Sequence, residues 1–169
     1  YFGRCFAPVA TVEVRGMATG TRELHVLSSW HLAGRIQALL LTGGSVFGLS
    51  AADGVVEWLS ERDEGFDAGV ARVPLVPAAV IFDLAPGIAR PGPREGRMAV
   101  EAASRDPVKL GRVGAGAGAT VGKLLGPERA SPGGVGSAVR DWGGGTIGAL
   151  AVVNALGDVV DAKGDIMAG

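Results

Sequence analysis

A continuous apolar run followed by a periodic one marks the first strongly patterned part of the chain. Residues 35–44 ("RIQALLLTGG") hold consecutive apolar residues and end in Thr-Gly-Gly, which is typical of a buried strand that closes in a tight turn. In residues 45–62 the apolar positions recur at helical spacing, and Ser45 is the expected N-cap. Gly48 and Gly54 lie inside this helix at a cost in helix propensity, so we expect them to let it pack closely on the sheet.

A second apolar segment, residues 73–84 ("VPLVPAAVIFDL"), contains two prolines in its first half. Because proline cannot donate a backbone hydrogen bond, Pro74 and Pro77 exclude a central strand there, and residues 78–84 are the better strand. A loop then leads to residues 94–105, a short helix candidate with a methionine and several alanines on its apolar side.

Short apolar segments joined by glycine-rich turns fill the last part of the chain. Residues 135–142 are predicted to pair with residues 146–154 across a Gly-Gly-Gly turn, and residues 159–160 with residues 166–167. No repeat, coiled coil or linker interrupts the sequence. The whole pattern predicts a single α/β domain, residues 1–169, in which helices cover a mixed or antiparallel sheet.

Composition narrows the class of protein. The chain has 169 residues, of which 47% are hydrophobic and 20% charged, enough for one folded core. A net charge of −1 gives no electrostatic footprint for nucleic acid or an anionic membrane surface, and the apolar runs are too short to span a bilayer. Cys5 is the only cysteine and cannot form an internal disulfide, which is compatible with the cytoplasm.

Both ends of the sequence are abrupt. The chain starts at Tyr1 in a strand-like segment without an initiator methionine, and it stops at "GDIMAG". We interpret it as a fragment or as one product of a cleaved precursor. The alternative is that poorly ordered ends extend it.

Glycine is the most unusual component, with 29 residues, and it is dense in "GAGAGATVGKLLG", residues 114–126. This segment resembles a phosphate-binding loop, but Leu124 stands where Ser or Thr must follow the lysine, and Ala117 stands where the first glycine is required. A dinucleotide-binding G-x-G-x-x-A reading also fits residues 114–119, but the preceding segment is a poor strand. Neither nucleotide reading is favoured.

Candidate catalytic groups are few. His25 and His31 are the only histidines and lack the spacing of metal ligands, so no metal and no cofactor is expected. No serine occupies a G-x-S-x-G turn. Composition and spacing therefore identify no self-contained nucleophile and base.

Six segments taken in order carry a specific resemblance. They are "VEVRGMATGTRE", "LLTGGSVFGLSAADGVVEWL", "VPLVPAAVIFDL", "RVGAGAGATVGKLLG", "GGVGSAV" and "VVNALGDVVDAKGDIMAG", and they cover residues 12–169. In this order they resemble the DmpA-type peptidases, which include L-aminopeptidase/D-esterases, β-peptidyl aminopeptidases and nylon-oligomer hydrolases.

The resemblance implies an enzyme made as a self-cleaving precursor. This chain would be the larger α subunit, and a separate β chain would begin with the Ser or Thr nucleophile, whose own α-amino group can act as base because its pKa lies near neutrality. The implied fold is a four-layer α/β/β/α sandwich, like that of N-terminal-nucleophile hydrolases but with different connectivity. The implied partners are the β chain, further αβ units and a small amide or peptide substrate. An acyltransferase of the ornithine acetyltransferase type and a processed, inactive binding relative remain alternatives.

The resemblance also assigns site residues. Asn154 matches an oxyanion-hole asparagine, and Lys123 matches a lysine that lowers the pKa of the nucleophile's amine or binds a substrate carboxylate. Phe82 matches an oxyanion-hole position, where it offers a backbone N–H and a pocket wall. Gly43, Gly44 and Ser45 are expected to line the substrate cleft. The structural alternatives are a strand-end turn for Asn154, an exposed lysine, a core phenylalanine and a plain tight connection.

Overall fold

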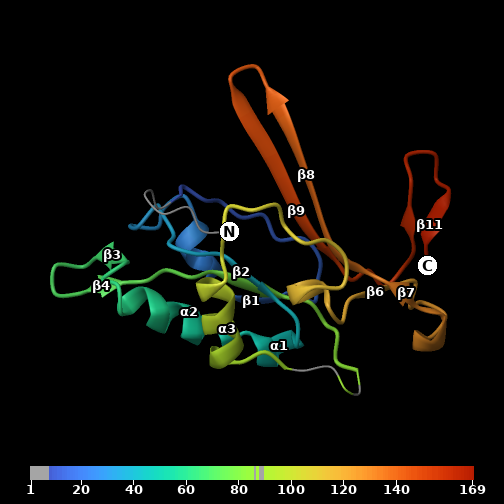
Figure 1. Ribbon diagram of the computed structural model, residues 1–169, viewed down its shortest axis with the longest axis horizontal. Coiled ribbons are helices and arrows are strands. Elements are labelled where there is room, and N and C mark those ends of the chain that lie inside the picture. The colour runs from blue at the N-terminus through green and yellow to red at the C-terminus, as the bar shows by residue number, and fades with distance from the viewer. Residues whose placement is uncertain (1–7, 86, 88–89) are drawn as a thin grey trace. The chain divides into compact units, whose positions relative to one another are not determined.

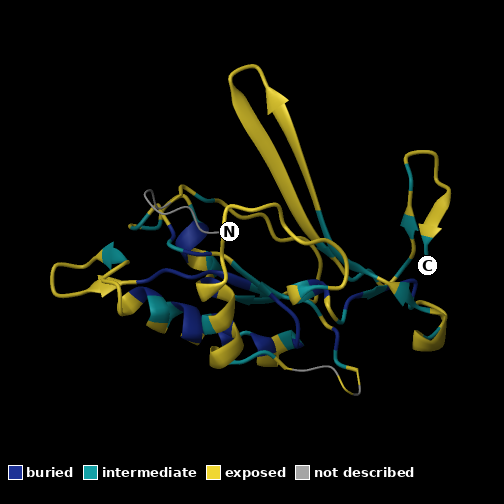
Figure 2. Ribbon diagram, viewed as in Figure 1, coloured by how far each residue is buried: buried dark blue, intermediate teal, exposed yellow. Residues whose placement is uncertain are grey.

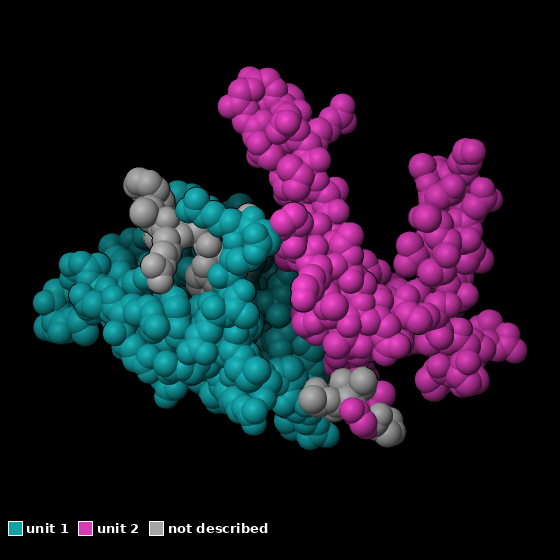
Figure 3. All heavy atoms as spheres, in the orientation of Figure 1, with its two compact units in different colours: residues 1–80, 89–106 teal, residues 81–88, 107–169 magenta. Residues whose placement is uncertain are grey.

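The computed structural model describes residues 8–85, 87 and 90–169, so Tyr1 and Cys5 lie outside the described residues. The chain divides into two compact units, shown in different colours in Figure 3. Unit 1 comprises residues 1–80 and 89–106, and unit 2 comprises residues 81–88 and 107–169. The single domain expected from the sequence pattern stays a prediction.

Unit 1 is built on a mixed three-stranded sheet with the strand order β1-β5-β2. The strands are β1 (Gly20–Arg22), β2 (Leu40–Thr42) and β5 (Ala78–Val80); β5 runs antiparallel to β1 and parallel to β2. The mixed sheet confirms the sequence prediction. Strand β5 starts directly after Pro77, as the proline argument requires, but it ends at Val80, four residues before the predicted end.

The helices of unit 1 are α1 (Ser45–Gly48), α2 (Ala51–Ser60) and α3 (Pro93–Glu101). The single helix predicted over residues 45–62 is therefore two helices, and the prediction of Ser45 as N-cap is wrong. Gly44 occupies that position with φ +82°, and Ser45, the first residue of α1, follows with φ +53°, so the left-handed turn includes both the cap and the start of the helix.

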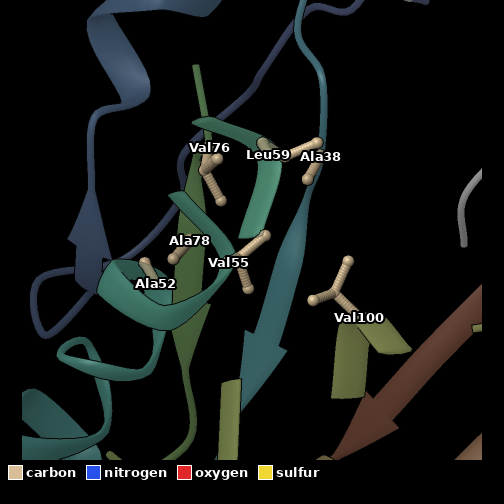
Figure 4. Close-up of a cluster of buried hydrophobic side chains, with 7 residues drawn as sticks. All are labelled: Ala38, Ala52, Val55, Leu59, Val76, Ala78 and Val100. Atoms are coloured by element: carbon tan, nitrogen blue, oxygen red, sulfur yellow. The ribbon is translucent and has the colours of Figure 1, made fainter. Parts of the chain in front are cut away.

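The larger core cluster of unit 1 joins α2 and α3 to the sheet (Figure 4). Seven buried side chains form it: Ala38, Ala52, Val55, Leu59, Val76, Ala78 and Val100. Gly54 lets α2 approach α3, because a methyl group on it would overlap the carbonyl oxygen of Pro93. The expectation that Gly54 faces the sheet is therefore corrected, since its close neighbour is the other helix.

A second cluster lies under the 3₁₀ helix η1 (Leu24–Leu27), where Val26, Leu27, Ile36 and Leu75 are buried together. The antiparallel pair β3 (Phe66–Asp67) and β4 (Arg72–Val73) completes unit 1. None of the helices in the described part of the chain has the length and apolar character needed to cross a membrane.

In its described residues, unit 2 has three strand pairs and two short 3₁₀ helices (Figure 1). The elements are η2 (Gly114–Gly116), β6 (Thr120–Val121), η3 (Pro127–Arg129), β7 (Ser131–Pro132), β8 (Gly134–Trp142), β9 (Gly145–Val153), β10 (Val159–Val160) and β11 (Ile166–Ala168). The pairings β8–β9 and β10–β11 confirm the two predicted hairpins.

The β8–β9 hairpin is long, and most of it is exposed (Figure 2). Its nine residue pairs run in unbroken register from Gly134↔Val153 to Trp142↔Gly145, and Gly143 and Gly144 form the turn with positive φ. The exposed apolar side chains include Val139, Trp142, Ile147, Leu150 and Val153. By the alternation of strand side chains they fall on both faces of the hairpin.

Candidate active site

Asn154, the first residue after β9, is the centre of a hydrogen-bond network in unit 2. Its side-chain oxygen Oδ1 accepts from the Thr120 backbone N–H at 3.0 Å and from Lys123 Nζ at 2.9 Å. Its Nδ2 donates to the Phe82 carbonyl oxygen at 2.7 Å. The two groups facing Oδ1 can only donate and the group facing Nδ2 can only accept, so the amide has one possible orientation.

The Lys123 ammonium is anchored by three oxygens. Besides Asn154 Oδ1, Nζ donates to the Thr120 carbonyl at 2.7 Å and to the Asn154 carbonyl at 3.4 Å. Burial lowers the pKa of Lys123 from its ordinary value, and the negative charge of Asp83 opposes part of that shift. Since an ammonium carries three protons, all of them are engaged within the chain.

This geometry separates the possible roles of Lys123. A lysine that binds a substrate carboxylate needs a proton to donate, and here each proton already meets a backbone or amide oxygen. The arrangement therefore favours a lysine that orients Asn154 over one that reaches a substrate. It is also unlike a solvated surface lysine, because the side chain is half-buried.

One N–H of Asn154 Nδ2 is directed to the Phe82 carbonyl, which leaves the second N–H of the amide for another acceptor. A fixed amide donor of this kind is the element from which oxyanion holes are made. The Phe82 side chain is 69% exposed, so in this chain it is not a core residue and it can line a pocket.

The glycine-rich segment before Lys123 lets other parts of unit 2 approach closely. Gly118 faces the Asp83 carboxylate, and Gly122, with φ +70°, faces the backbone of Gly169. The backbone N–H groups of Gly122 and Lys123 donate to the carbonyls of residues 157 and 156, at 2.8 and 2.7 Å. No α-helix begins in residues 114–129, all of which are described, so the segment is not a phosphate-binding loop.

The predicted site residues fall in both units. Unit 2 brings Phe82, Lys123 and Asn154 together in one network. Gly43, Gly44 and Ser45 lie in unit 1, at the turn between β2 and α1, where a methyl group on Gly44 would lie 2.9 Å from the ring of Pro91. That turn is tight and its Ser45 has an unusual left-handed φ, a conformation that often accompanies functional sites.

Two contributors were not among the predicted site residues: Thr120 was not considered, and Asp83 was interpreted as structural or processing-related. Thr120 joins the network through its backbone N–H and carbonyl, which any residue type would supply, so no sequence signal marks it. Asp83 is only 8% exposed. Its signal was present in the sequence, because an acidic residue directly after a buried apolar segment is unusual unless something compensates its charge.

Comparison with known proteins decides the family. The sequence model of Peptidase family S58 matches residues 4–166. The chain belongs to Peptidase family S58. This family is the one that contains the DmpA-type enzymes, so the resemblance seen in the six sequence segments is confirmed.

Several curated relatives in the S58 family are similar along most of this chain. An uncharacterized aminopeptidase of Mycobacterium tuberculosis is 48% identical over 158 residues, which cover 90% of this chain and 43% of the relative. One of Mycobacterium leprae is 44% identical over 163 residues, with the same coverage. A 6-aminohexanoate-oligomer endohydrolase of Paenarthrobacter ureafaciens is 37% identical over 134 residues, 78% of this chain and 37% of that enzyme. The chain thus spans less than half the length of these S58 relatives.

Proposed function

We propose that this chain is the α subunit of an amide hydrolase that activates itself by cutting its own precursor. The observation that carries the proposal is the network of Asn154, Lys123 and Phe82, in which a half-buried cation and two backbone groups fix one amide. Membership of a peptidase family and relatives named aminopeptidase and oligomer endohydrolase support hydrolysis of amide bonds.

The proposed reaction divides its groups between two chains. The Ser or Thr hydroxyl at the start of the β chain attacks the amide carbonyl carbon, while its α-amino group accepts the hydroxyl proton. The carbonyl oxygen becomes an oxyanion, and the second N–H of Asn154 stabilises it. The C–N bond then breaks, the amine leaves with the transferred proton, and water hydrolyses the acyl-enzyme. The substrate would be a small amide or peptide.

The proposed assembly is a four-layer α/β/β/α sandwich completed by the β chain, with αβ units joining into larger oligomers. The β8–β9 hairpin supports it, because an isolated two-stranded hairpin with apolar side chains on both faces is marginal in water. Further strands and layers would bury those side chains.

Replacing Asn154 tests the catalytic part of the proposal. In the complete protein, Asn154→Ala is expected to lower kcat by about 100- to 1,000-fold, the usual loss for one oxyanion-hole donor. The matched control is Gln37→Ala, which removes another side-chain amide that accepts a backbone N–H, from Leu75 at 2.9 Å in unit 1. Equal, small losses in kcat for both variants would contradict the role of Asn154.

Mass spectrometry of the purified complete protein tests the processing. Two chains are expected, the second beginning with Ser or Thr. A single uncut chain, or a second chain with another first residue, would contradict the proposed nucleophile. If an added amine captures the acyl group in place of water, the enzyme is an acyltransferase.

A further inference from the structure

Three segments of unit 2 meet at Gly122, the residue before Lys123. The first segment carries these two residues and bonds through its backbone N–H groups to the carbonyls of residues 156–157. The second is the start of β10 and the third is the end of β11, where Val159 pairs with Ala168. Figure 1 shows the end of β11 at the base of its hairpin, near β6 and β7.

At this meeting point Gly169, the residue after β11, is packed between Asp158 and Gly122. A methyl group on Gly169 would overlap the Asp158 carboxylate, at 2.5 Å from its Cγ and 2.7 Å from its Cβ. A methyl group on Gly122 would lie 2.6 Å from the carbonyl carbon of Gly169 and 3.3 Å from Asp158 Oδ1. The close approach of the three residues therefore depends on glycine at both positions, and both have positive φ.

This packing brings residue 169 next to the candidate active site. Gly122 is bonded covalently to Lys123, whose ammonium donates to Asn154 Oδ1 at 2.9 Å. The β10–β11 hairpin thus leads the chain away from Asn154 and returns it to the loop that orients the Asn154 amide. Under the proposed function, the peptide bond that the precursor cuts lies beyond residue 169, so the hairpin directs the chain toward the site of the cut.

The Asp158 carboxylate has unused capacity to accept hydrogen bonds. It is exposed, and no residue in the described part of the chain donates a hydrogen bond to it or forms an ion pair with it. Another acid of the same hairpin shows what such a group does beside backbone: Asp161 Oδ1 accepts the N–H groups of Lys163 and Asp165, at 2.8 and 3.0 Å. A carboxylate that touches the backbone of residue 169 can accept N–H groups in the same way.

We propose that Asp158 is a positioning residue for self-cleavage: its carboxylate accepts backbone N–H groups of the precursor chain after Gly169 and so holds the peptide bond that is cut near the Asn154 amide. This inference rests on the proposed function. In the cut, the Ser or Thr hydroxyl oxygen attacks the carbonyl carbon of the peptide bond before it, the C–N bond breaks, and the nitrogen takes the hydroxyl proton. Water then hydrolyses the ester to a carboxylate and a free hydroxyl. A reacting carbonyl must be held in position for such a step.

The half-time of the cut in the complete precursor tests this role. The precursor is made by cell-free synthesis, sampled over time and resolved on a denaturing gel. Asp158→Ala is expected to lengthen the half-time by about 10- to 100-fold, because the peptide bond loses its positioning contact. Asp158→Asn keeps the shape and one acceptor oxygen but not the charge, so its half-time should lie between those of the parent and the alanine variant. The matched control, Asp165→Ala, removes an exposed carboxylate at the opposite end of the same hairpin and should keep the parent half-time.

The outcomes separate this proposal from the proposed function. Equal half-times for Asp158→Ala and Asp165→Ala, in a precursor whose parent form is cut, overturn the role of Asp158 alone. A parent precursor that stays uncut overturns the proposed function and this role with it. If Asp158→Ala is recovered unfolded, Asp158→Asn is compared with Asp165→Asn. A longer half-time for Asp158→Asn supports the proposal, and equal half-times overturn it.

Discussion

At the scale of single residues, the site depends on groups that have no freedom to change partner. Asn154 has one possible amide orientation, and Lys123 uses all three of its protons. The sequence pattern could not predict this network, because Lys123 and Asn154 are 31 positions apart. Sequence spacing predicts contacts only within one helix or one hairpin. Lys123 and Asn154 were both assigned to the site only through the family resemblance.

Gly122 is a residue where even a small substitution should lower the stability. Its φ of +70° disfavours any side chain, and a methyl group there would overlap the Cα of Gly169. Gly122→Ala is expected to lower the free energy of unfolding by about 2 kcal/mol or more, combining a left-handed conformation with overpacking. Chemical denaturation of the complete protein measures it.

The control for Gly122 is Gly157→Ala, since a methyl group at Gly157 would meet nothing within 4 Å. The two glycines lie on adjacent segments, joined by the hydrogen bond from Gly122 N–H to the Gly157 carbonyl. Equal losses of stability in the two variants would refute the account of Gly122.

At the scale of elements, local sequence patterns predicted which helices and strands exist better than where each begins and ends. The two hairpins were found because alternation and glycine turns act between neighbours in the chain. The break between α1 and α2 was missed, because Leu49 and Ser50 keep helical backbone angles and only their hydrogen bonds change, each N–H bonding to the carbonyl three residues back. The partner of Gly54 was also missed, since helical spacing does not say which element lies opposite.

The contact between α2 and α3 contains the ion pair whose pH dependence is clearest. Arg97 binds Glu61 with two bonds of 2.7 Å, and this pairing lowers the pKa of Glu61 below its ordinary value of 4.5. A lowered acid pKa contributes stability that is present above pH 4.5 and is lost as the pH falls through the folded-state value.

Glu61→Gln should therefore flatten the acid side of the stability profile. Thermal unfolding midpoints of the complete protein between pH 3 and pH 7 measure this effect. Below about pH 4.5 the midpoint of the variant is expected to fall less on acidification than that of the parent protein. Glu57→Gln, in α2 one turn before Glu61 and outside the Arg97 ion pair, is the matched control. An acid profile of Glu61→Gln identical to that of the parent would contradict the assignment.

At the scale of the whole molecule, the long β8–β9 hairpin is the feature that we expect to pair with additional strands. In a two-stranded antiparallel pair, only alternate residues bond to the partner strand, and the others point their N–H groups outward. Val135 already shows the outward pattern, because its N–H and carbonyl both pair with Gly111 at 2.8 Å.

Hydrogen exchange of the complete protein tests whether the hairpin joins a larger sheet. If it does, amides at all positions of residues 134–142 and 145–153 will be protected, including those that point outward. Protection limited to every second residue would mean that the hairpin stands alone, and the four-layer assembly would lose its support. The exposed strand pair β3–β4 serves as the internal reference.

The anchored ammonium of Lys123 also offers a view of the site that needs no substitution. Lysine protons usually exchange with water too fast to give a nitrogen-15 signal, and three hydrogen bonds slow that exchange. Lys123 should therefore stand out among the lysines as an observable resonance. Lys123 Nζ donates to Oδ1 of Asn154, so a molecule that binds to the Asn154 amide should shift the Lys123 resonance. The resonance therefore reports on binding at the site.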